Sequence, residues 1–276
     1  MSKEFENFKK KSLHEYDSIL PILIIDPITT RINYLIKKKK IKITPNQISN
    51  ARIFILSPLI LISMFLAPIF NLAWMYLVTA GLFYLSLLTD GWDGQLARAL
   101  DMKSKKGFFL DLIGDRCSII IFLFLIFSVG MFTHNNILVY SSVFLFTIKT
   151  FHMMIITKVY YLGGIKTEKE TLSVFTEVDT LGKMGVNQIY SIIAKLNKIL
   201  KIKRWDGTIA APDRYIMTIM VPCILLFFRN NVINTVIIWY FYILILFFTI
   251  FFMIRIKNLL KESFIKFSLE DKKNKN

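Results

Sequence analysis

Long apolar runs with few polar residues inside them dominate the chain from residue 53 to residue 254. A helix needs about 20 residues to cross the apolar core of a bilayer. Several runs reach that length only if the acidic residues at their ends belong to the same helices. The pattern therefore predicts an all-α membrane protein with six transmembrane helices, the second and third of which extend beyond the bilayer. The six runs are Ile53–Phe70, Leu72–Thr89, Ser118–Phe132, Ile137–Ile156, Tyr215–Phe228 and Val232–Ile254.

The chain before the first run has a different pattern. Residues 1–18 are polar and mixed in charge, and nothing in them resembles a secretory signal. Residues 19–43 combine apolar residues with a run of four lysines, which predicts an amphipathic helix lying in the cytoplasmic interface of the membrane. Thr44 and Pro45 follow, and we expect Thr44 to cap the first transmembrane helix with Pro45 at its first position.

The rest of the chain divides into a membrane domain and a short tail. Residues 44–256 contain all six apolar runs, and residues 257–276 form a charged C-terminal tail. Between the fourth and fifth runs lies a long connection, residues 161–211, which we expect to be a cytoplasmic loop. The sequence assigns no role to this loop.

Composition and charge define the surroundings of these helices. The chain is 54% apolar and contains 25 phenylalanines, which is too apolar for an ordinary soluble domain. Lysine and arginine gather in alternate connections, so the positive-inside rule places both termini and the loop between the second and third helices in the cytoplasm. The net charge of +16 then favours anionic lipid headgroups as partners. We expect no nucleic-acid partner, because no basic, aromatic-rich soluble domain accompanies the charge.

Four aspartates lie at the junction of the second and third predicted helices. Asp90 and Asp93 are three residues apart, and Asp111 and Asp115 are four residues apart, so each pair shares one face of its helix. We expect these two helices to be antiparallel neighbours whose acidic faces meet. Acidic residues close to membrane depth are costly, and they usually mark functional sites.

Carboxylates held together repel one another unless cations neutralise them. Hard divalent cations such as Mg²⁺ and Mn²⁺ prefer oxygen ligands and leave positions for phosphate oxygens, whereas no cluster of His and Cys suggests zinc. We interpret the aspartates as a site for one or two such ions that bridge a diphosphate. Gly94, Ala97 and Gly107 leave room beside the site, and the guanidinium of Arg98 is suited to a phosphate.

The spacing of these residues resembles the signature of the CDP-alcohol phosphotransferases, also called the CDP-alcohol phosphatidyltransferase family. The matching stretch is Asp90-x-x-Asp93-Gly94-x-x-Ala97-Arg98-x(8)-Gly107-x-x-x-Asp111-x-x-x-Asp115, with all eight positions present. In addition, the run from Thr44 to Ser49 is similar to the start of the first membrane helix in that family.

The resemblance implies metal-dependent transfer of a substituted phosphate group from a CDP-alcohol to an acceptor hydroxyl, with release of CMP, in phospholipid biosynthesis. It implies two Mg²⁺ or Mn²⁺ ions, a homodimer, and a general-base role for Asp115 in addition to metal binding. The metal ligands implied are Asp90, Asp93, Asp111 and Asp115. The CDP-binding residues implied are Asp90, Gly94, Ala97, Arg98 and Gly107.

Five further polar residues are candidates for an acceptor site. Lys149 and His152 either bind an anionic group of the acceptor, or are a lysine that reaches the interface and a hydrogen-bonded core histidine. Asp213 either caps the fifth membrane helix or joins the acceptor site together with Arg214. Arg52 is either interfacial or lines the same pocket.

Two donor classes stay open. One is CDP-diacylglycerol with a polar acceptor such as glycerol phosphate, serine, inositol or inositol phosphate. The other is a soluble CDP-alcohol, such as CDP-choline, CDP-ethanolamine or CDP-inositol, with a lipid or polyol acceptor. We favour the lipid donor because it is commoner among chains of this length. A function of another class, a membrane transporter with a structural divalent-cation site, is less favoured because the sequence has no internal repeat.

Overall fold

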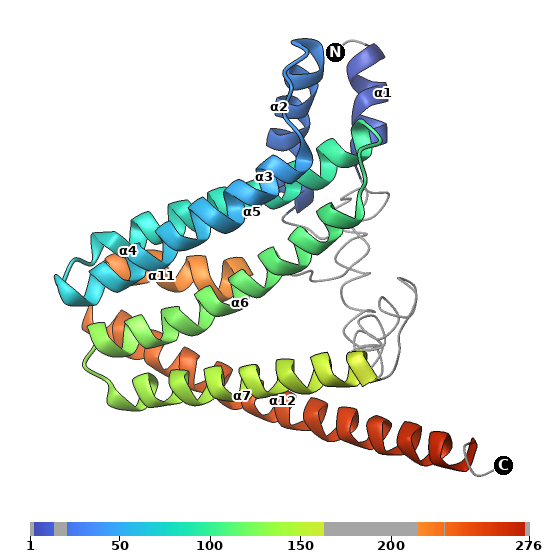
Figure 1. Ribbon diagram of the computed structural model, residues 1–276. Helices are drawn as coiled ribbons and strands as arrows, with labels where there is room; N and C mark the ends of the chain where they lie inside the picture. Colours follow the sequence, from blue (N-terminus) through green and yellow to red (C-terminus); the bar gives the residue numbers. More distant parts are fainter. Residues whose placement is uncertain (1–2, 14–20, 163–214, 229, 274–276) are drawn as a thin grey trace, which may run out of the picture.

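The structure is a computed structural model that describes residues 3–13, 21–162, 215–228 and 230–273. Every regular element in these residues is a helix, in agreement with the predicted all-α class (Figure 1). In chain order the elements are α1 (Lys3–Ser12), η1 (Pro21–Ile25), α2 (Asp26–Lys38), α3 (Pro45–Ala51), η2 (Arg52–Leu56), α4 (Ser57–Ile69), α5 (Trp74–Ala99), α6 (Lys105–Phe132), α7 (Asn136–Leu162), η3 (Ile216–Met220), α11 (Val221–Phe227) and α12 (Asn231–Lys273).

Three short π-helical turns, η1, η2 and η3, each end two residues before a proline. The prolines are Pro27, Pro58 and Pro222. Proline has no N–H group, so an α-helical hydrogen bond is lost at its position, and a wider turn can re-pair the carbonyls nearby. In η2 the N–H of Ser57 donates to the carbonyl of Arg52, five residues earlier. The elements α3, η2 and α4 therefore form one continuous helix with a wide turn inside it.

The start of this helix confirms the predicted cap. The side chain of Thr44 accepts a hydrogen bond from the N–H of Gln47, and the Gln47 side chain accepts one in return from the N–H of Thr44. Pro45 occupies the first turn. This reciprocal pair satisfies backbone donors that have no partner inside the helix, and so fixes where the helix begins.

The arrangement of the next two helices differs from our expectation. Helices α5 and α6 make few direct contacts, so the prediction that they pack on each other was wrong. The helix formed by α3, η2 and α4 instead lies against both of them (Figure 1). On the other sides, α11 packs against α5, and α7 packs against α6 and α12.

A neutral polar network joins α4, α5 and α6 inside the apolar core. The hydroxyl of Tyr76 lies 2.9 Å from the hydroxyl of Ser128, and Ser128 Oγ donates to the carbonyl of Met64 at 2.6 Å. A second contact, 2.7 Å long, joins the hydroxyls of Ser63 and Thr79. Large apolar side chains enclose these groups: Ile60, Met64, Phe83, Ile121, Leu125 and Ile126.

Three of the described helices are long and apolar enough to cross a membrane: Pro45–Ile69, Lys105–Phe132 and Asn231–Ile250. They contain the first, third and sixth predicted runs. The second run lies in α5, and the fourth and fifth runs lie in the shorter apolar helices Asn136–Phe151 and Ile216–Phe227. The predicted count of six spans is therefore supported in part, and the interfacial position of residues 19–43 stays a prediction.

The two ends of the chain contain more helix than the sequence indicated. Residues 3–12 form α1, which packs against α2 and α5 and contains the buried ring of Phe8. That ring meets Tyr34 edge-on with 5.7 Å between the centroids. At the other end α12 continues as far as Lys273, through most of the expected tail. Almost all of the loop 161–211 lies outside the described residues.

Candidate active site

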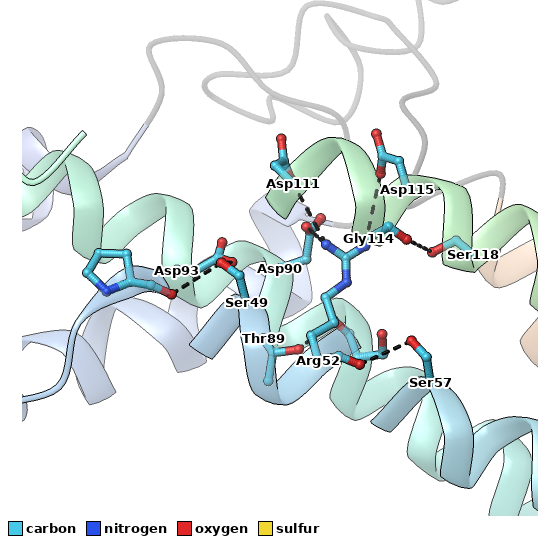
Figure 2. A network of polar contacts seen from close by, with 12 residues as sticks. Ser49, Arg52, Ser57, Thr89, Asp90, Asp93, Asp111, Gly114, Asp115 and Ser118 are labelled. Atoms are coloured by element: carbon cyan, nitrogen blue, oxygen red, sulfur yellow. Dashed lines mark hydrogen bonds and ion pairs between the residues drawn. The ribbon is translucent and has the colours of Figure 1, made fainter. Parts of the chain in front are cut away.

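Asp90, Asp111 and Asp115 converge on the side chain of Arg52, and Asp93 lies beside them against Ser49 (Figure 2). Arg52 pairs directly with Asp90, and its two terminal nitrogens lie 4.0 Å from carboxylate oxygens of Asp111 and Asp115. Asp90 belongs to α5, Asp111 and Asp115 belong to α6, and Arg52 begins η2 in the helix between them. The predicted meeting of the two acidic faces is thus present, but an arginine from a third helix joins them.

Burial divides the carboxylates into two kinds. The side chains of Asp111 and Asp115 are 60% and 50% exposed, whereas that of Asp90 is 25% exposed. Asp93 is buried and accepts a 2.5 Å hydrogen bond from Ser49. The α6 carboxylates therefore form the open side of the site, and the α5 carboxylates form its inner wall.

Gly114 makes room for the arginine. A Cβ atom at this position would lie 2.8 Å from Nη1 and 2.9 Å from Cζ of Arg52. Such contacts are too short for a side chain, so only glycine allows the guanidinium to lie this close to α6. Sequence reasoning missed this role. The available signal was a glycine one residue before Asp115, facing the acidic cluster.

The CDP-binding candidates lie along the last turns of α5 and the first turn of α6. Gly94 lies under the guanidinium of Arg98, whose Nη1 is 3.3 Å from the place of a Cβ atom. Arg98 Nε donates to the carbonyl of Ser12 at the end of α1, at 2.7 Å. The N–H of Gly107 donates to the capping hydroxyl of Ser104, and Ala97 is half-buried.

A buried polar network, missed by sequence reasoning, attaches α2 to the same stretch of α5. Gln95 donates to Asp26 at 2.6 Å and accepts from Thr30 at 3.1 Å. One turn away, Asn33 donates to the carbonyl of Trp92 at 3.3 Å. These bonds hold α5 between Asp90 and Arg98, and so restrict how the signature residues can move.

The predicted acceptor residues divide between described and undescribed parts of the chain. Arg52 is only 3% exposed and lies among the aspartates, which favours the alternative in which it lines the pocket. Lys149 is half-buried on α7. The side chain of His152, and residues Asp213 and Arg214, lie outside the described part of the structure.

The donor set fits a hard divalent cation in chemistry, since carboxylate oxygens are what Mg²⁺ and Mn²⁺ prefer. The distances between these carboxylates, however, do not fit a bound ion. Within the described residues, no three or more His, Cys, Asp or Glu side chains are grouped closely enough to hold a metal ion. The guanidinium of Arg52 lies between the two carboxylate pairs, and this separates them.

Comparison with protein families gave a match to CDP-alcohol phosphatidyltransferase over residues 42–176. This segment contains all eight signature positions and the helices that bring them together. Searches among curated proteins and among solved structures gave no match. The matched segment, its apolar helices and the acidic cluster agree: the chain belongs to the CDP-alcohol phosphatidyltransferase family, membrane transferases that generally depend on a divalent metal.

Proposed function

We propose that the protein transfers a substituted phosphate group from a CDP-alcohol to the hydroxyl of an acceptor and releases CMP. The observation that carries this proposal is the meeting of Asp90, Asp111 and Asp115 from two helices around the guanidinium of Arg52. Phosphoryl transfer depends mainly on positioning and on neutralising charge, and a compact group of carboxylates serves both purposes once cations are bound.

Asp90, Asp93, Asp111 and Asp115 are the residues that would hold one or two Mg²⁺ or Mn²⁺ ions. Bound there, the ions would offset the negative charge of the diphosphate and of the carboxylates themselves. The hydrogen bond from Ser49 orients Asp93, and the pairing of Arg52 orients Asp90. The α5 pair is therefore held in place before any ion binds.

Asp115 is the proposed general base. In the reaction the acceptor oxygen forms a bond to the phosphorus, the bond from phosphorus to the CMP oxygen breaks, and the acceptor proton passes to the Asp115 carboxylate. Its side chain is half exposed, so an incoming hydroxyl can reach it. Asp111, one turn earlier and also exposed, supports the view that the acceptor approaches from the α6 side.

We assign CDP to the α5 side of the site. Asp90, Gly94, Ala97, Arg98 and Gly107 are the proposed contacts, and the small residues among them leave space for the cytidine. Arg98 is held by the carbonyl of Ser12, which keeps its guanidinium over Gly94. A fixed guanidinium loses less conformational entropy when it binds a phosphate than a free one does.

For the donor we favour CDP-diacylglycerol with a polar acceptor, and we place both termini and the active site on the cytoplasmic side. A soluble CDP-alcohol donor with a lipid or polyol acceptor is the alternative. Lys149, His152, Asp213 and Arg214 are proposed acceptor contacts, with Arg52 close enough to the reacting group to assist them. A homodimer is the proposed assembly.

CMP release by the purified protein in detergent tests the reaction. CDP-diacylglycerol and a panel of soluble CDP-alcohols would be supplied in turn with mixed acceptors, in Mg²⁺, Mn²⁺ or EDTA. We expect metal-dependent CMP release with one donor class, and its loss in Asp115→Asn. Asp101→Asn is the matched control, because Asp101 is an exposed aspartate at a variable position between Arg98 and Gly107. No CMP from any donor, together with no metal-dependent binding of CDP, would reopen the transporter alternative.

A further inference from the structure

We infer that Arg52 is a built-in counter-ion that occupies the cation position of the acidic cluster and is displaced when the divalent metal binds. This inference rests on the metal binding proposed above. It concerns what the chain does in the absence of metal, and how tightly metal is held. The two states would share the same carboxylates but use different cations.

The position of Arg52 is the first argument. Its guanidinium lies between the α5 and α6 carboxylates, in direct contact with Asp90 and 4.0 Å from both Asp111 and Asp115 (Figure 2). A Mg²⁺ ion needs its oxygen ligands at about 2.0–2.1 Å. Ligands from both helices can approach one ion that closely only if the guanidinium leaves the space between them.

Charge is the second argument. When all are ionised, the four carboxylates and one guanidinium leave an excess of negative charge, so the cluster still attracts cations. An ion entering beside Arg52 meets an unfavourable positive charge, because like charges a few ångströms apart repel strongly in a partly buried site. The free energy of metal binding is therefore the difference between the pairing of the carboxylates with the metal and their pairing with Arg52.

The construction around Arg52 is the third argument. A side chain that is 3% exposed needs charged partners, since burying an unpaired charge is strongly unfavourable. Gly114 provides the space on α6, and the π-helical turn η2 begins at Arg52 itself. The contact between Arg52 and the carboxylates thus depends on two features: the glycine leaves space for the guanidinium, and the wide turn sets the direction of the Arg52 side chain.

Mn²⁺ binding to the full-length protein in detergent, measured by electron paramagnetic resonance without any CDP-alcohol, tests the inference. We expect Arg52→Gln to bind Mn²⁺ on the order of tenfold more tightly than the unmodified protein, since a nearby positive charge shifts a carboxylate equilibrium by about 1–3 powers of ten. Arg52→Lys keeps the charge and should stay close to the unmodified value. Arg31→Gln, an exposed arginine of α2, is the matched control and should change nothing.

Gly114→Ala provides a second route that keeps the arginine. The added methyl group would push the guanidinium away from α6, so Mn²⁺ binding should again become tighter. A second readout is thermal unfolding in EDTA. Arg52→Gln should unfold at a lower temperature than the unmodified protein there, because its carboxylates lose the positive charge of Arg52, and Mn²⁺ should raise its unfolding temperature by the larger amount.

The outcomes separate this inference from the proposed function. If Arg52→Gln and Gly114→Ala bind Mn²⁺ no more tightly than the unmodified protein, while Asp111→Asn loses binding, the counter-ion role is wrong and the metal site stands. If neither the unmodified protein nor any Arg52 variant binds Mn²⁺, the metal site itself is wrong. Tighter binding in both variants, with the EDTA-dependent loss of stability in Arg52→Gln, supports the inference.

Discussion

Two of the polar clusters described above differ in how completely their groups are paired. In the neutral network of Tyr76, Ser128, Ser63 and Thr79, each hydroxyl has a partner, and all four residues are buried. In the acidic cluster, the carboxylates of Asp90, Asp111 and Asp115 share Arg52, and two of them are at least half exposed. The first cluster is complete without any ligand. In the second, the carboxylates of Asp111 and Asp115 stay accessible from one side.

This difference separates residues that hold helices together from residues that do chemistry. A buried, satisfied network contributes stability and fixes how helices pack. An accessible excess of like charge lowers stability, so it persists where a ligand or a reaction requires it. Substitutions in the acidic cluster should therefore lower activity but not stability, and substitutions in the neutral network should lower stability but not activity.

The largest expected effect is the loss of activity in Asp111→Asn. One carboxylate fewer weakens the binding of both the cation and the diphosphate, so CMP formation should fall on the order of 10³-fold, which is about 4 kcal/mol. The unfolding temperature in EDTA should stay the same or rise, because repulsion between carboxylates is relieved. CMP release and thermal unfolding, with Asp101→Asn as control, measure both. A change in activity of less than tenfold would remove Asp111 from the metal site.

Ser128→Ala should give the reverse profile. It removes two hydrogen bonds of the Ser128 hydroxyl in the core, one with Tyr76 and one to the Met64 carbonyl, while Tyr76 still donates to the Ser128 carbonyl. At about 0.5–1.5 kcal/mol for each bond, we expect a loss of about 1–3 kcal/mol in unfolding free energy. CMP formation per folded molecule should stay within about twofold, since the network lies away from the aspartates. Reversible unfolding in mixed detergent and a parallel CMP assay would measure this. Strong loss of activity without loss of stability would mean that the two clusters are coupled.

The smallest expected effect is that of Ser49→Ala, which removes the hydrogen bond to Asp93. A single hydrogen bond to a charged group contributes about 1.5–3 kcal/mol, but the bound cation would take over part of this stabilisation. We therefore expect an activity loss of about threefold to tenfold at low Mg²⁺ that becomes smaller at saturating Mg²⁺. A titration of activity against Mg²⁺ would show this, with Ser142→Ala as a matched control, because Ser142 is a buried serine of α7 whose hydroxyl donates to the carbonyl of Val139. An equal loss at all Mg²⁺ concentrations would indicate a different role for Ser49.

Local patterns predicted much of the fold and part of the site. The apolar runs correctly indicated an all-helical chain, and Thr44-Pro45 correctly marked the start of a helix. The spacing of Asp90, Asp93, Asp111 and Asp115 was sufficient to place each pair on one helix face, because that depends only on the helical repeat.

The remaining features depend on contacts between segments far apart in sequence. Arg52 reaches the aspartates only because its helix lies between α5 and α6, and no local pattern reports which helix lies between two others. The bonds of Gln95 to Asp26 and of Arg98 to Ser12 join residues 69 and 86 positions apart. Helix α1 is polar in sequence, so no apolar pattern predicts that it packs against α5.

The wide turn before Pro58 also determines how this protein can vary. With an extra residue in one turn, the part of the helix before the proline is rotated about its axis relative to the part after it. Within this one helix, the turn therefore sets separately which residues before it face the active site and which residues after it face the core. Residues of α4 can therefore be substituted to suit their neighbours without turning Arg52 away from its carboxylates, as long as Pro58 is kept.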